Sequence, residues 1–434
     1  MKMLVLATMA AVTAGAAEYT LHTFKKLALT DQFWCEGAHF GDFNRDGKMD
    51  VVAGPFIYPG PDFKSRGEYR PADKTSKIKK ADGTEVIIPG YKGALGNEND
   101  YSDNFLTYTW DFNGDGWMDI ICYPWPGKEC YWYENPKGAA GHWPKHKVMD
   151  VLDNESPMFG DINGDGKPEI VANSGGYLGY LTFNWQDPRQ PGTFHPISPK
   201  GKWHKYTHGI GFGDLNGDGR ADLLEQNGWW EQPQSLAGDP VWTFHAFPFA
   251  PGPGAAQMYA YDFNGDGLND VLTCLDPHKY GLAWYEQYRE GGEIKFKQHL
   301  IMNKEPKDNK YGVKFSQPHA IELVDMDRDG VLDVLVGKRF WAHGPKGDVE
   351  PDAPAVLYWF RTARDAGKNV DFIPYLIDDN SGVGTQVTFG DLNGDQWPEV
   401  IVGNKKGAFV FLHEVKKVSQ AEWAAAQPKP LAAP

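Results

Sequence analysis

Seven short acidic loops recur along the chain, each of the form Asp-x-Asn/Asp-x-Asp-Gly-x-x-Asp/Glu. They begin at Asp42, Asp111, Asp161, Asp214, Asp262, Asp325 and Asp391. Calcium takes several oxygen ligands at about 2.3–2.6 Å, and alternate residues of a tight turn can supply them. The sequence therefore predicts up to seven structural Ca²⁺ ions, and self-similarity at this spacing predicts a repeat architecture.

The expected ligands are the first, third, fifth and ninth residues of each loop. In the sixth loop the third residue is Asp327, where the other loops have Asn. The expected ligands are Asp42, Asn44, Asp46, Asp50, Asp111, Asn113, Asp115, Asp119, Asp161, Asn163, Asp165, Glu169, Asp214, Asn216, Asp218, Asp222, Asp262, Asn264, Asp266, Asp270, Asp325, Asp327, Asp329, Asp333, Asp391, Asn393, Asp395 and Glu399. The seventh loop has Gln396 where the pattern has Gly, so we expect it to bind most weakly. An acidic turn that binds nothing is the alternative for any single copy.

The same spacing begins an EF-hand, which requires flanking helices and an acid at the twelfth position. Glu225 is the only acid at that position, and short β-branched runs such as residues 50–53 and 333–337 follow the loops. Each loop is therefore expected to be a β-hairpin turn. Aromatic-rich runs supply two further strands, so that each repeat holds four strands when the strand leading into the loop is counted.

Four-stranded units repeated radially make a propeller. The sequence predicts an all-β, seven-bladed β-propeller over residues 18–417, with an N-terminal strand that completes the last blade and closes the ring. Residues 418–434 form an Ala- and Pro-rich tail. Recurrent outer-strand histidines are assigned to structural roles. They are His22, His146, His245 and His299.

Residues 1–17 have the charged start, apolar stretch and small-residue end of a secretory signal peptide. A buried amino-terminal helix is the alternative. The mature chain is expected to be secreted or periplasmic, where calcium is plentiful. The net charge of −15 comes mostly from the acidic loops, so it reflects a metal requirement, and we expect no nucleic-acid partner and no membrane span. Cys122 and Cys130 flank one hairpin and could pair, whereas Cys35 and Cys274 are expected to be free and buried.

The motif Phe-Gly-Asp-x-Asn-Gly-Asp-Gly-x-x-Asp at Phe212–Asp222, with a variant at Phe389–Glu399, resembles the FG-GAP and VCBS repeats of exported bacterial proteins and integrin-like propellers. This resemblance covers nearly the whole mature chain and implies the propeller fold. The stretch from His208 to Pro233 is similar to the propeller part of the fungal aldos-2-ulose (anhydrofructose) dehydratases. Those enzymes also have cupin domains, which this sequence does not contain, so an activity located there is not implied.

In integrin-like propellers the calcium loops lie at the bottom of each blade. By this resemblance, the residues six positions earlier are expected at the opposite, upper mouth of the channel. They are Glu36, Phe105, Glu155, His208, Ala256, His319 and Thr385. Four of the seven are ionisable and of the types used for proton transfer or metal binding. Loops that return to the same face add a cationic, aromatic rim. It consists of His278, Lys279, Tyr280, Lys338, Arg339, Trp341, His343, Asn404, Lys405 and Lys406.

These residues suit a carbohydrate lyase or dehydratase that acts on a keto-sugar by proton abstraction and β-elimination. The base would be His208 or His319, and Lys338, Arg339 or a further divalent metal would stabilise the enolate. That metal would be held by Glu36, Glu155 and the histidines. The substrate would be bound by His278, Tyr280, Trp341, His343, Asn404 and Lys405. Hydrolysis by Glu36 and Glu155 is another possibility, and a non-catalytic sugar- or matrix-binding propeller is the rival class.

Overall fold

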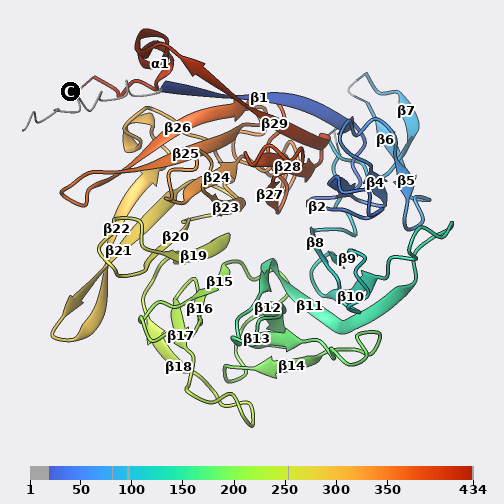
Figure 1. Ribbon diagram of the computed structural model, residues 1–434, viewed down its shortest axis with the longest axis horizontal. Helices are drawn as coiled ribbons and strands as arrows, with labels where there is room; N and C mark the ends of the chain where they lie inside the picture. Colours follow the sequence, from blue (N-terminus) through green and yellow to red (C-terminus); the bar gives the residue numbers. More distant parts are fainter. Residues whose placement is uncertain (1–18, 81, 95–97, 253, 433–434) are drawn as a thin grey trace, which may run out of the picture.

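The computed structural model describes residues 19–80, 82–94, 98–252 and 254–432, so the predicted signal peptide lies outside the described residues. Within them the regular secondary structure is almost entirely β-strand, which confirms the all-β prediction. Figure 1 shows the sheets arranged around a central axis, as in a β-propeller. None of the described helices is long and apolar enough to span a membrane.

One four-stranded sheet contains β2 (Ala38–Gly41), β3 (Asp50–Ala53), β4 (Phe56–Tyr58) and β5 (Gly67–Glu68). A seven-stranded sheet contains β8 (Leu106–Trp110), β9 (Asp119–Tyr123), β10 (Lys128–Tyr133), β11 (Lys145–Gly160), β12 (Glu169–Ser174), β13 (Tyr177–Thr182) and β14 (Thr193–Pro196). An eight-stranded sheet contains β15 (Ile210–Gly213), β16 (Asp222–Glu225), β17 (Gly228–Glu231), β18 (Thr243–Ala246), β19 (Gln257–Tyr261), β20 (Asp270–Cys274), β21 (Leu282–Glu290) and β22 (Glu293–Met302). Two further four-stranded sheets contain β23 (Ala320–Val324), β24 (Asp333–Gly337), β25 (Leu357–Arg364) and β26 (Val370–Asp378), and β27 (Val387–Gly390), β28 (Glu399–Asn404), β29 (Gly407–Val418) and β1 (Tyr19–Thr30).

The two larger sheets each join two neighbouring units. The long strand β11 pairs with β10 through its first half, where His146 lies opposite Trp132, and with β12 through its second half, where Phe159 lies opposite Ile170. In the eight-stranded sheet, β15 and β19 pair in parallel. Strands that lead into the acidic loops lie nearest the centre of the molecule. Figure 1 shows this for β2, β8, β15, β19, β23 and β27.

The two ends of the described chain meet in one sheet. β1 pairs antiparallel with β29, from Tyr19 opposite Val418 to Thr30 opposite Ala408. The predicted tail begins with helix α1 (Gln420–Ala426), whose Trp423 ring lies 5.3 Å from the Tyr19 ring. This pairing covers edge N–H and C=O groups that an open sheet would expose.

The longest interruption of the repeat lies between β4 and β8. After β5 it forms a hairpin of β6 (Thr75–Lys79) and β7 (Glu85–Pro89). Its end is fastened to the body, because Tyr91 N donates to Phe33 O at 2.9 Å and Ala94 N donates to Lys405 O at 3.0 Å. One more short element, the 3-10 helix η1 (Pro306–Asp308), follows β22.

The outer-strand histidines pack on aromatic rings of the neighbouring strand. The His245 imidazole stacks on Trp229 with ring centroids 4.1 Å apart, and its Nε2 lies 2.7 Å from Glu231 Oε2. His146 and His299 each make the same pair of contacts with a Trp and a Glu of their own units. Such repeated aromatic and hydrogen-bond contacts are typical of structural residues.

All four cysteines are buried free thiols. The predicted pairing of Cys122 with Cys130 is wrong, because the antiparallel register places Tyr131 opposite Cys122. Cys130 Sγ instead donates to the carbonyl oxygen of Cys122 at 3.5 Å. Cys35 and Cys274 are free and buried, as the sequence predicted.

Candidate functional site

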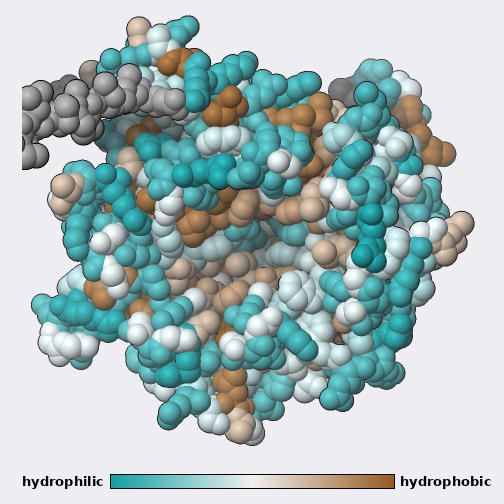
Figure 2. All heavy atoms as spheres, in the orientation of Figure 1, coloured by the Kyte–Doolittle hydropathy of each residue, from teal (hydrophilic) through white to brown (hydrophobic). Residues whose placement is uncertain are grey.

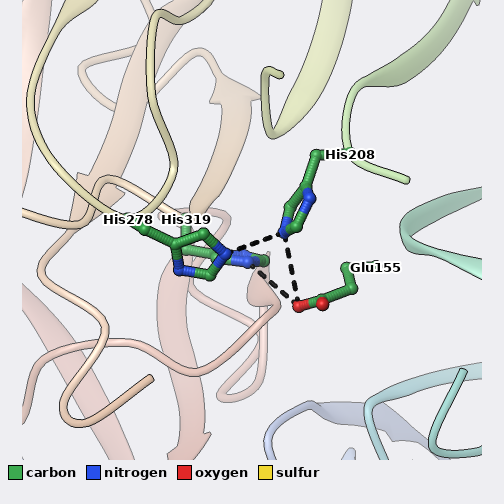
Figure 3. A group of neighbouring side chains, drawn as sticks. All are labelled: Glu155, His208, His278 and His319. Atoms are coloured by element: carbon green, nitrogen blue, oxygen red, sulfur yellow. Dashed lines mark hydrogen bonds and ion pairs between the residues drawn. The ribbon is translucent and has the colours of Figure 1, made fainter. Parts of the chain in front are cut away.

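Three imidazoles and one carboxylate converge on the face opposite the acidic loops, which we call the upper face. Glu155 lies within β11, His208 just before β15, His278 in the turn between β20 and β21, and His319 just before β23. Figure 3 shows these four side chains pointing into one shared space. We call them the histidine cluster. They meet because the inner strands run side by side, so residues that precede different inner strands end close to the axis.

The polar atoms of the histidine cluster have the spacing of metal ligands. Glu155 Oε2 lies 3.4 Å from both His208 Nε2 and His319 Nε2. His278 Nε2 lies 3.0 Å from His208 Nε2. In a tetrahedral site with bonds of about 2.0–2.1 Å, ligand atoms stand about 3.3 Å apart. Imidazole nitrogens and a carboxylate oxygen form a donor set that suits zinc and related divalent ions.

Burial and charge give these groups the protonation states that metal ligands require. Burial, with the nearby charge of Arg339, lowers the pKa of His319 to about 3, and burial also lowers the pKa of His278. Burial would raise the pKa of Glu155, but the close approach of His208 and His319 and the charge of Arg339 outweigh it and hold that pKa well below its usual range. Among the described residues, neither ring nitrogen of His319 has a hydrogen-bond partner, because the approach of Glu155 lacks hydrogen-bond geometry. An anionic carboxylate thus faces His278 and His319, whose neutral rings have lone pairs to donate.

Arg339 joins the histidine cluster to a second buried carboxylate. Its Nη1 lies 3.3 Å from Glu155 Oε2 and its Nη2 lies 3.4 Å from Glu36 Oε1. Lys405 Nζ lies 3.9 Å from the same Glu36 oxygen, and burial lowers the pKa of Lys405 to about 8. Burial also raises the pKa of Glu36, against the charges of Arg339 and Lys405. Glu36 therefore belongs to an ion-pair network beside the cluster rather than to the cluster itself.

Other predicted site residues make contacts outside the cluster. Lys338 Nζ donates to Ser316 Oγ at 2.5 Å, and burial lowers the pKa of Lys338 to about 8. Trp341 Nε1 donates to Pro351 O, and Asn404 Nδ2 donates to Ser381 O, both at 2.9 Å. These three side chains hold backbone loops in place.

The rest of the predicted rim lies at the edge of the cluster. The His343 ring is 4.6 Å from the His278 ring, and its Nδ1 is 3.5 Å from Asp348. Lys314 Nζ lies 5.8 Å from the Tyr280 ring centroid. Lys279 pairs with Asp276 at 3.4 Å, and Lys406 Nζ lies 4.5 Å from the Phe340 ring centroid. Apart from the ring contact between His343 and His278, none of these contacts involves a member of the histidine cluster.

A cavity of about 590 Å³ borders His208, with Trp203, His204 and Tyr206 among its lining residues. In the view shown, Figure 2 displays a hollow at the centre of the molecule. Side chains also bridge the inner strands: Gln257 Nε2 donates to Thr385 O at 3.0 Å, and Gln386 Nε2 donates to Thr107 O at 2.8 Å. Of the four residues of the histidine cluster, His208 alone lines this cavity.

In the acidic loops the structure divides the predicted ligands into two kinds. In the fourth loop Asp214 accepts the backbone N–H groups of Asp218 and Gly219, which shapes the turn. The ninth residue, Asp222, is buried and accepts N–H groups from Leu215 and Gln232, both at 3.0 Å. Burial raises the pKa of Asp222 to about 7. The ninth-position acid therefore ties its loop to the third strand of the unit.

The sixth loop carries an arginine partner. Oxygens of Asp325, Asp327 and Asp329 lie within 4.8 Å of one another, an oxygen-only donor set of the kind that suits calcium. Arg361 Nη2 also lies 2.8 Å from Asp329 Oδ2, and its Nε contacts Asp327. Part of the negative charge of this loop is thus already compensated.

Gln317 positions two site residues, His319 and Arg339, although no sequence pattern marks it. Its backbone carbonyl accepts the N–H groups of both His319, at 2.8 Å, and Arg339, at 2.9 Å. Gln317 has a φ of 61°, a conformation that is uncommon for a residue with a side chain. A residue that acts through its carbonyl leaves no signature in a sequence pattern, so only the fold could reveal it.

Three segments of the chain match the FG-GAP-like repeat, at residues 111–172, 161–225 and 262–336. Each segment starts at one acidic loop and ends after the next one. The chain carries FG-GAP-like repeats. Together with the all-β architecture they fit a β-propeller. No curated protein matches the chain.

Solved structures with a similar arrangement include three of different kinds. A Tc holotoxin pore of Photorhabdus luminescens has 16% identity and a TM-score of 0.37, over 78% of this chain and 16% of that chain. An Agrocybe aegerita lectin that recognises non-reducing terminal N-acetylglucosamine has 15% identity and a TM-score of 0.43, over 93% of this chain and 87% of that chain. An auxiliary nutrient binding protein from Bacteroides ovatus has 8% identity and a TM-score of 0.42, over 84% and 83%. These scores are too low to support a functional argument for this chain.

Proposed function

We propose that the histidine cluster is the active site of a carbohydrate lyase or dehydratase. In this reaction a proton is removed next to the carbonyl of a keto-sugar and a β-leaving group is expelled. The observation that carries the proposal is the convergence of three imidazoles and the Glu155 carboxylate at 3.0–3.4 Å, with the Arg339 guanidinium against that carboxylate. The similarity of the stretch from His208 to Pro233 to the propeller part of aldos-2-ulose dehydratases supports the same class.

The four members of the cluster divide into a base and a metal-holding set. His208 is the base, because it lines the cavity through which a substrate would enter. Glu155, His278 and His319 would hold a divalent cation, since their ligand atoms lie within 4.8 Å of one another. Such a cation would stabilise the negative charge of an enolate oxygen as a Lewis acid. Arg339 fixes the Glu155 carboxylate and adds positive charge at the site.

The elimination balances without an oxidant or reductant. His208 takes the proton from the carbon next to the carbonyl, and the C–H electron pair becomes the π-bond of the enolate. This pair then forms the C=C bond as the C–O bond at the β-carbon breaks. The leaving oxygen takes the proton back from His208. The products are an unsaturated keto-sugar and water, or an alcohol where the leaving group is glycosidic.

The proposal extends to the fold, the calcium loops and the export of the chain. The chain is a seven-bladed propeller, with one acidic loop in each four-stranded unit, and the β1–β29 pairing supports closure of its ring by the N-terminal strand. Calcium in the loops stabilises the propeller, since their side chains offer oxygen donors. The pattern of residues 1–17 supports export, so the chain is secreted or periplasmic.

A non-catalytic carbohydrate-binding propeller is the second candidate. It is favoured by an aromatic surface cleft in which the Tyr101 and Trp125 rings lie 4.1 Å apart. Such a protein would bind sugar without exchanging a carbon-bound proton. Proton exchange therefore separates the two candidates.

The test is incubation with 2-keto-glucose and a panel of oxidised glycans in D₂O. The wild type is expected to exchange the proton next to the carbonyl, seen by NMR, and to form an ultraviolet-absorbing enone. His208→Ala should lose both signals. His245→Ala, which alters an outer-strand histidine on Trp229, is the matched control and should retain them. If the wild type gives neither exchange nor enone with any member of the panel, the lyase proposal is wrong.

Metal binding has its own measurement. Titration of the metal-free protein with Zn²⁺ alone should show one strong site in the wild type that His319→Ala weakens at least tenfold. His245→Ala should bind Zn²⁺ as the wild type does. Equal Zn²⁺ affinity in wild type and His319→Ala would remove the metal from the proposal.

A further inference from the structure

A second cavity, of about 800 Å³, lies between the segment inserted between β4 and β8 and the sheet that contains β9 and β10. We call this segment the inserted segment. Five aromatic side chains line the cavity: Tyr91, Tyr101, Trp125, Tyr131 and Tyr133. We call this cavity the aromatic cleft. Its volume falls within the range of roughly 300–1,000 Å³ that is typical of small-molecule sites. The cleft is distinct from the histidine cluster, since none of the four cluster residues lines it.

Aromatic contacts connect the aromatic cleft to the histidine cluster along two routes. Tyr101 contacts Trp125 at 4.1 Å and also carries Lys405 Nζ at 4.2 Å from its ring centroid. Lys405 in turn lies 3.9 Å from Glu36 in the ion-pair network of Arg339. By the second route, the Trp125 ring lies 5.9 Å from the Tyr206 ring. Tyr206 lines the smaller cavity that borders His208.

Several charged groups of the aromatic cleft have partners within it. Arg70 forms a two-point ion pair with Asp103, at 3.0 and 3.1 Å. Lys145 Nζ lies 3.6 Å from the Tyr131 ring centroid. The lining contains three basic residues and three acidic ones, so it presents no net charge. A cleft of this kind suits a neutral ligand with apolar faces and hydroxyl edges better than an anionic one.

A neutral sugar ring has both properties. Its C–H faces pack on aromatic rings, and its hydroxyl groups bond with polar groups at the cleft edge. We infer that the aromatic cleft binds a sugar ring of a neutral oligosaccharide, one or more residues away from the ring at the histidine cluster. The inference rests on the proposed function for the reacting ring, but occupation of the cleft can be measured by binding alone.

The experiment measures binding of cellotetraose, xylotetraose, maltotetraose and tetra-N-acetylchitotetraose by isothermal titration, with glucose and N-acetylglucosamine as short controls. The wild type should bind at least one tetrasaccharide at least tenfold more tightly than its monosaccharide. Trp125→Ala should lose at least tenfold of that affinity, and Trp125→Phe should lose less, because a smaller aromatic face remains.

The matched control is Tyr288→Ala, which removes an exposed aromatic ring on β21 that does not line the cleft. It should leave tetrasaccharide affinity unchanged. If Trp125→Ala fails to fold, judged by its thermal unfolding, Trp125→Phe and Tyr131→Ala carry the test. The inference is overturned if the wild type binds none of the four tetrasaccharides, or if the folded cleft variants bind as tightly as the wild type.

The two proposals fail in different ways. Proton exchange on 2-keto-glucose without tetrasaccharide binding leaves the lyase proposal standing and overturns the aromatic cleft. Tetrasaccharide binding that depends on Trp125, without any proton exchange, supports the cleft and favours the non-catalytic alternative.

Discussion

The acidic loops and the histidine cluster lie at opposite ends of the same inner strands. His208 stands just before β15 and Asp214 directly after it, and His319 and Asp325 flank β23 in the same way. The loop end repeats in all seven places, whereas the cluster takes one residue from each of four successive units. Repetition at one end is what a scaffold requires. At the other end, residues that differ from one unit to the next can form a single site on the axis.

Removal of calcium from the acidic loops should have the largest effect, and it should act on the stability of the fold. For each occupied loop, free calcium at 100-fold above its dissociation constant stabilises the fold by about 3 kcal/mol. A calcium-selective chelator should therefore lower the thermal unfolding midpoint strongly, with zinc added back to keep the cluster occupied. An unchanged midpoint would mean that the loops bind no calcium.

His208→Ala should have the next largest effect, at the other end of the strands. Loss of a general base costs about 10²–10⁴-fold in rate. The readout is the rate of enone formation, and the unfolding midpoint should match that of the wild type. A large drop in stability instead would assign His208 to the scaffold.

Asp222→Ala tests whether the ninth loop position is structural. The substitution leaves the buried N–H groups of Leu215 and Gln232 without an acceptor, at a cost of about 3 kcal/mol in the free energy of unfolding. Denaturant unfolding in the absence of calcium measures it. Asp218→Ala, at the exposed fifth position, is the control and should cost less than about 1 kcal/mol under the same conditions. Equal costs for the two variants would contradict the division of roles.

The pairing of β1 with β29 should respond to pH. His413 Nε2 and His22 Nδ1 lie 2.9 Å apart across β29 and β1. Burial, with His22 nearby, lowers the pKa of His413 to about 3, and burial also lowers that of His22, beside Asp327 and Arg361. A depressed histidine pKa gives stability that is present above about 6.5 and is lost as the pH falls toward about 3.

From pH 6.5 to pH 5.0, His413 should therefore remove about 2 kcal/mol from the free energy of unfolding. Urea unfolding at both values measures the loss, and His413→Gln should show a smaller loss. His245→Gln is the control and should follow the wild type. A wild-type slope in His413→Gln would show that the pairing does not sense pH through this residue.

The smallest effect is expected in the seventh loop. Gln396 has a φ of 72°, whereas the corresponding residue of the other loops is a glycine, for example Gly219 with a φ of 86°. Gln396→Gly should relieve this backbone strain and stabilise the fold by about 1 kcal/mol. Gly219→Gln should destabilise it by a similar amount. Thermal unfolding measures both, and a destabilised Gln396→Gly would show that the glutamine side chain holds the loop.

Much of the scaffold could be predicted from the sequence, because its signals are local. The residues of each acidic loop are adjacent in the chain, and the short apolar runs after them set the strands. The site was predictable only in part. Counting six residues back from each loop selects Glu155, His208 and His319, which do meet, but it also selects Glu36, which pairs with Arg339 instead.

The sequence pattern did not predict which side chains point toward the axis. Lys338 and Arg339 are neighbours, yet Arg339 reaches Glu155 while Lys338 bonds to Ser316. Neighbouring residues of an extended chain point to opposite sides, and no local signal says which side faces the axis. His278 comes from a turn between two strands, so its entry into the cluster depended on how that turn folds over the upper face.

The sequence by itself determined the repeat, the turn chemistry and the strand-rich fold, since each depends on residues close together in the chain. Only the tertiary structure decided which residues share a site. Positions 155 and 319 are remote in sequence, and their side chains lie 3.4 Å apart because the inner strands of different units surround one axis. The aromatic cleft has the same origin, since the fold lays the inserted segment against a sheet that follows it in the chain.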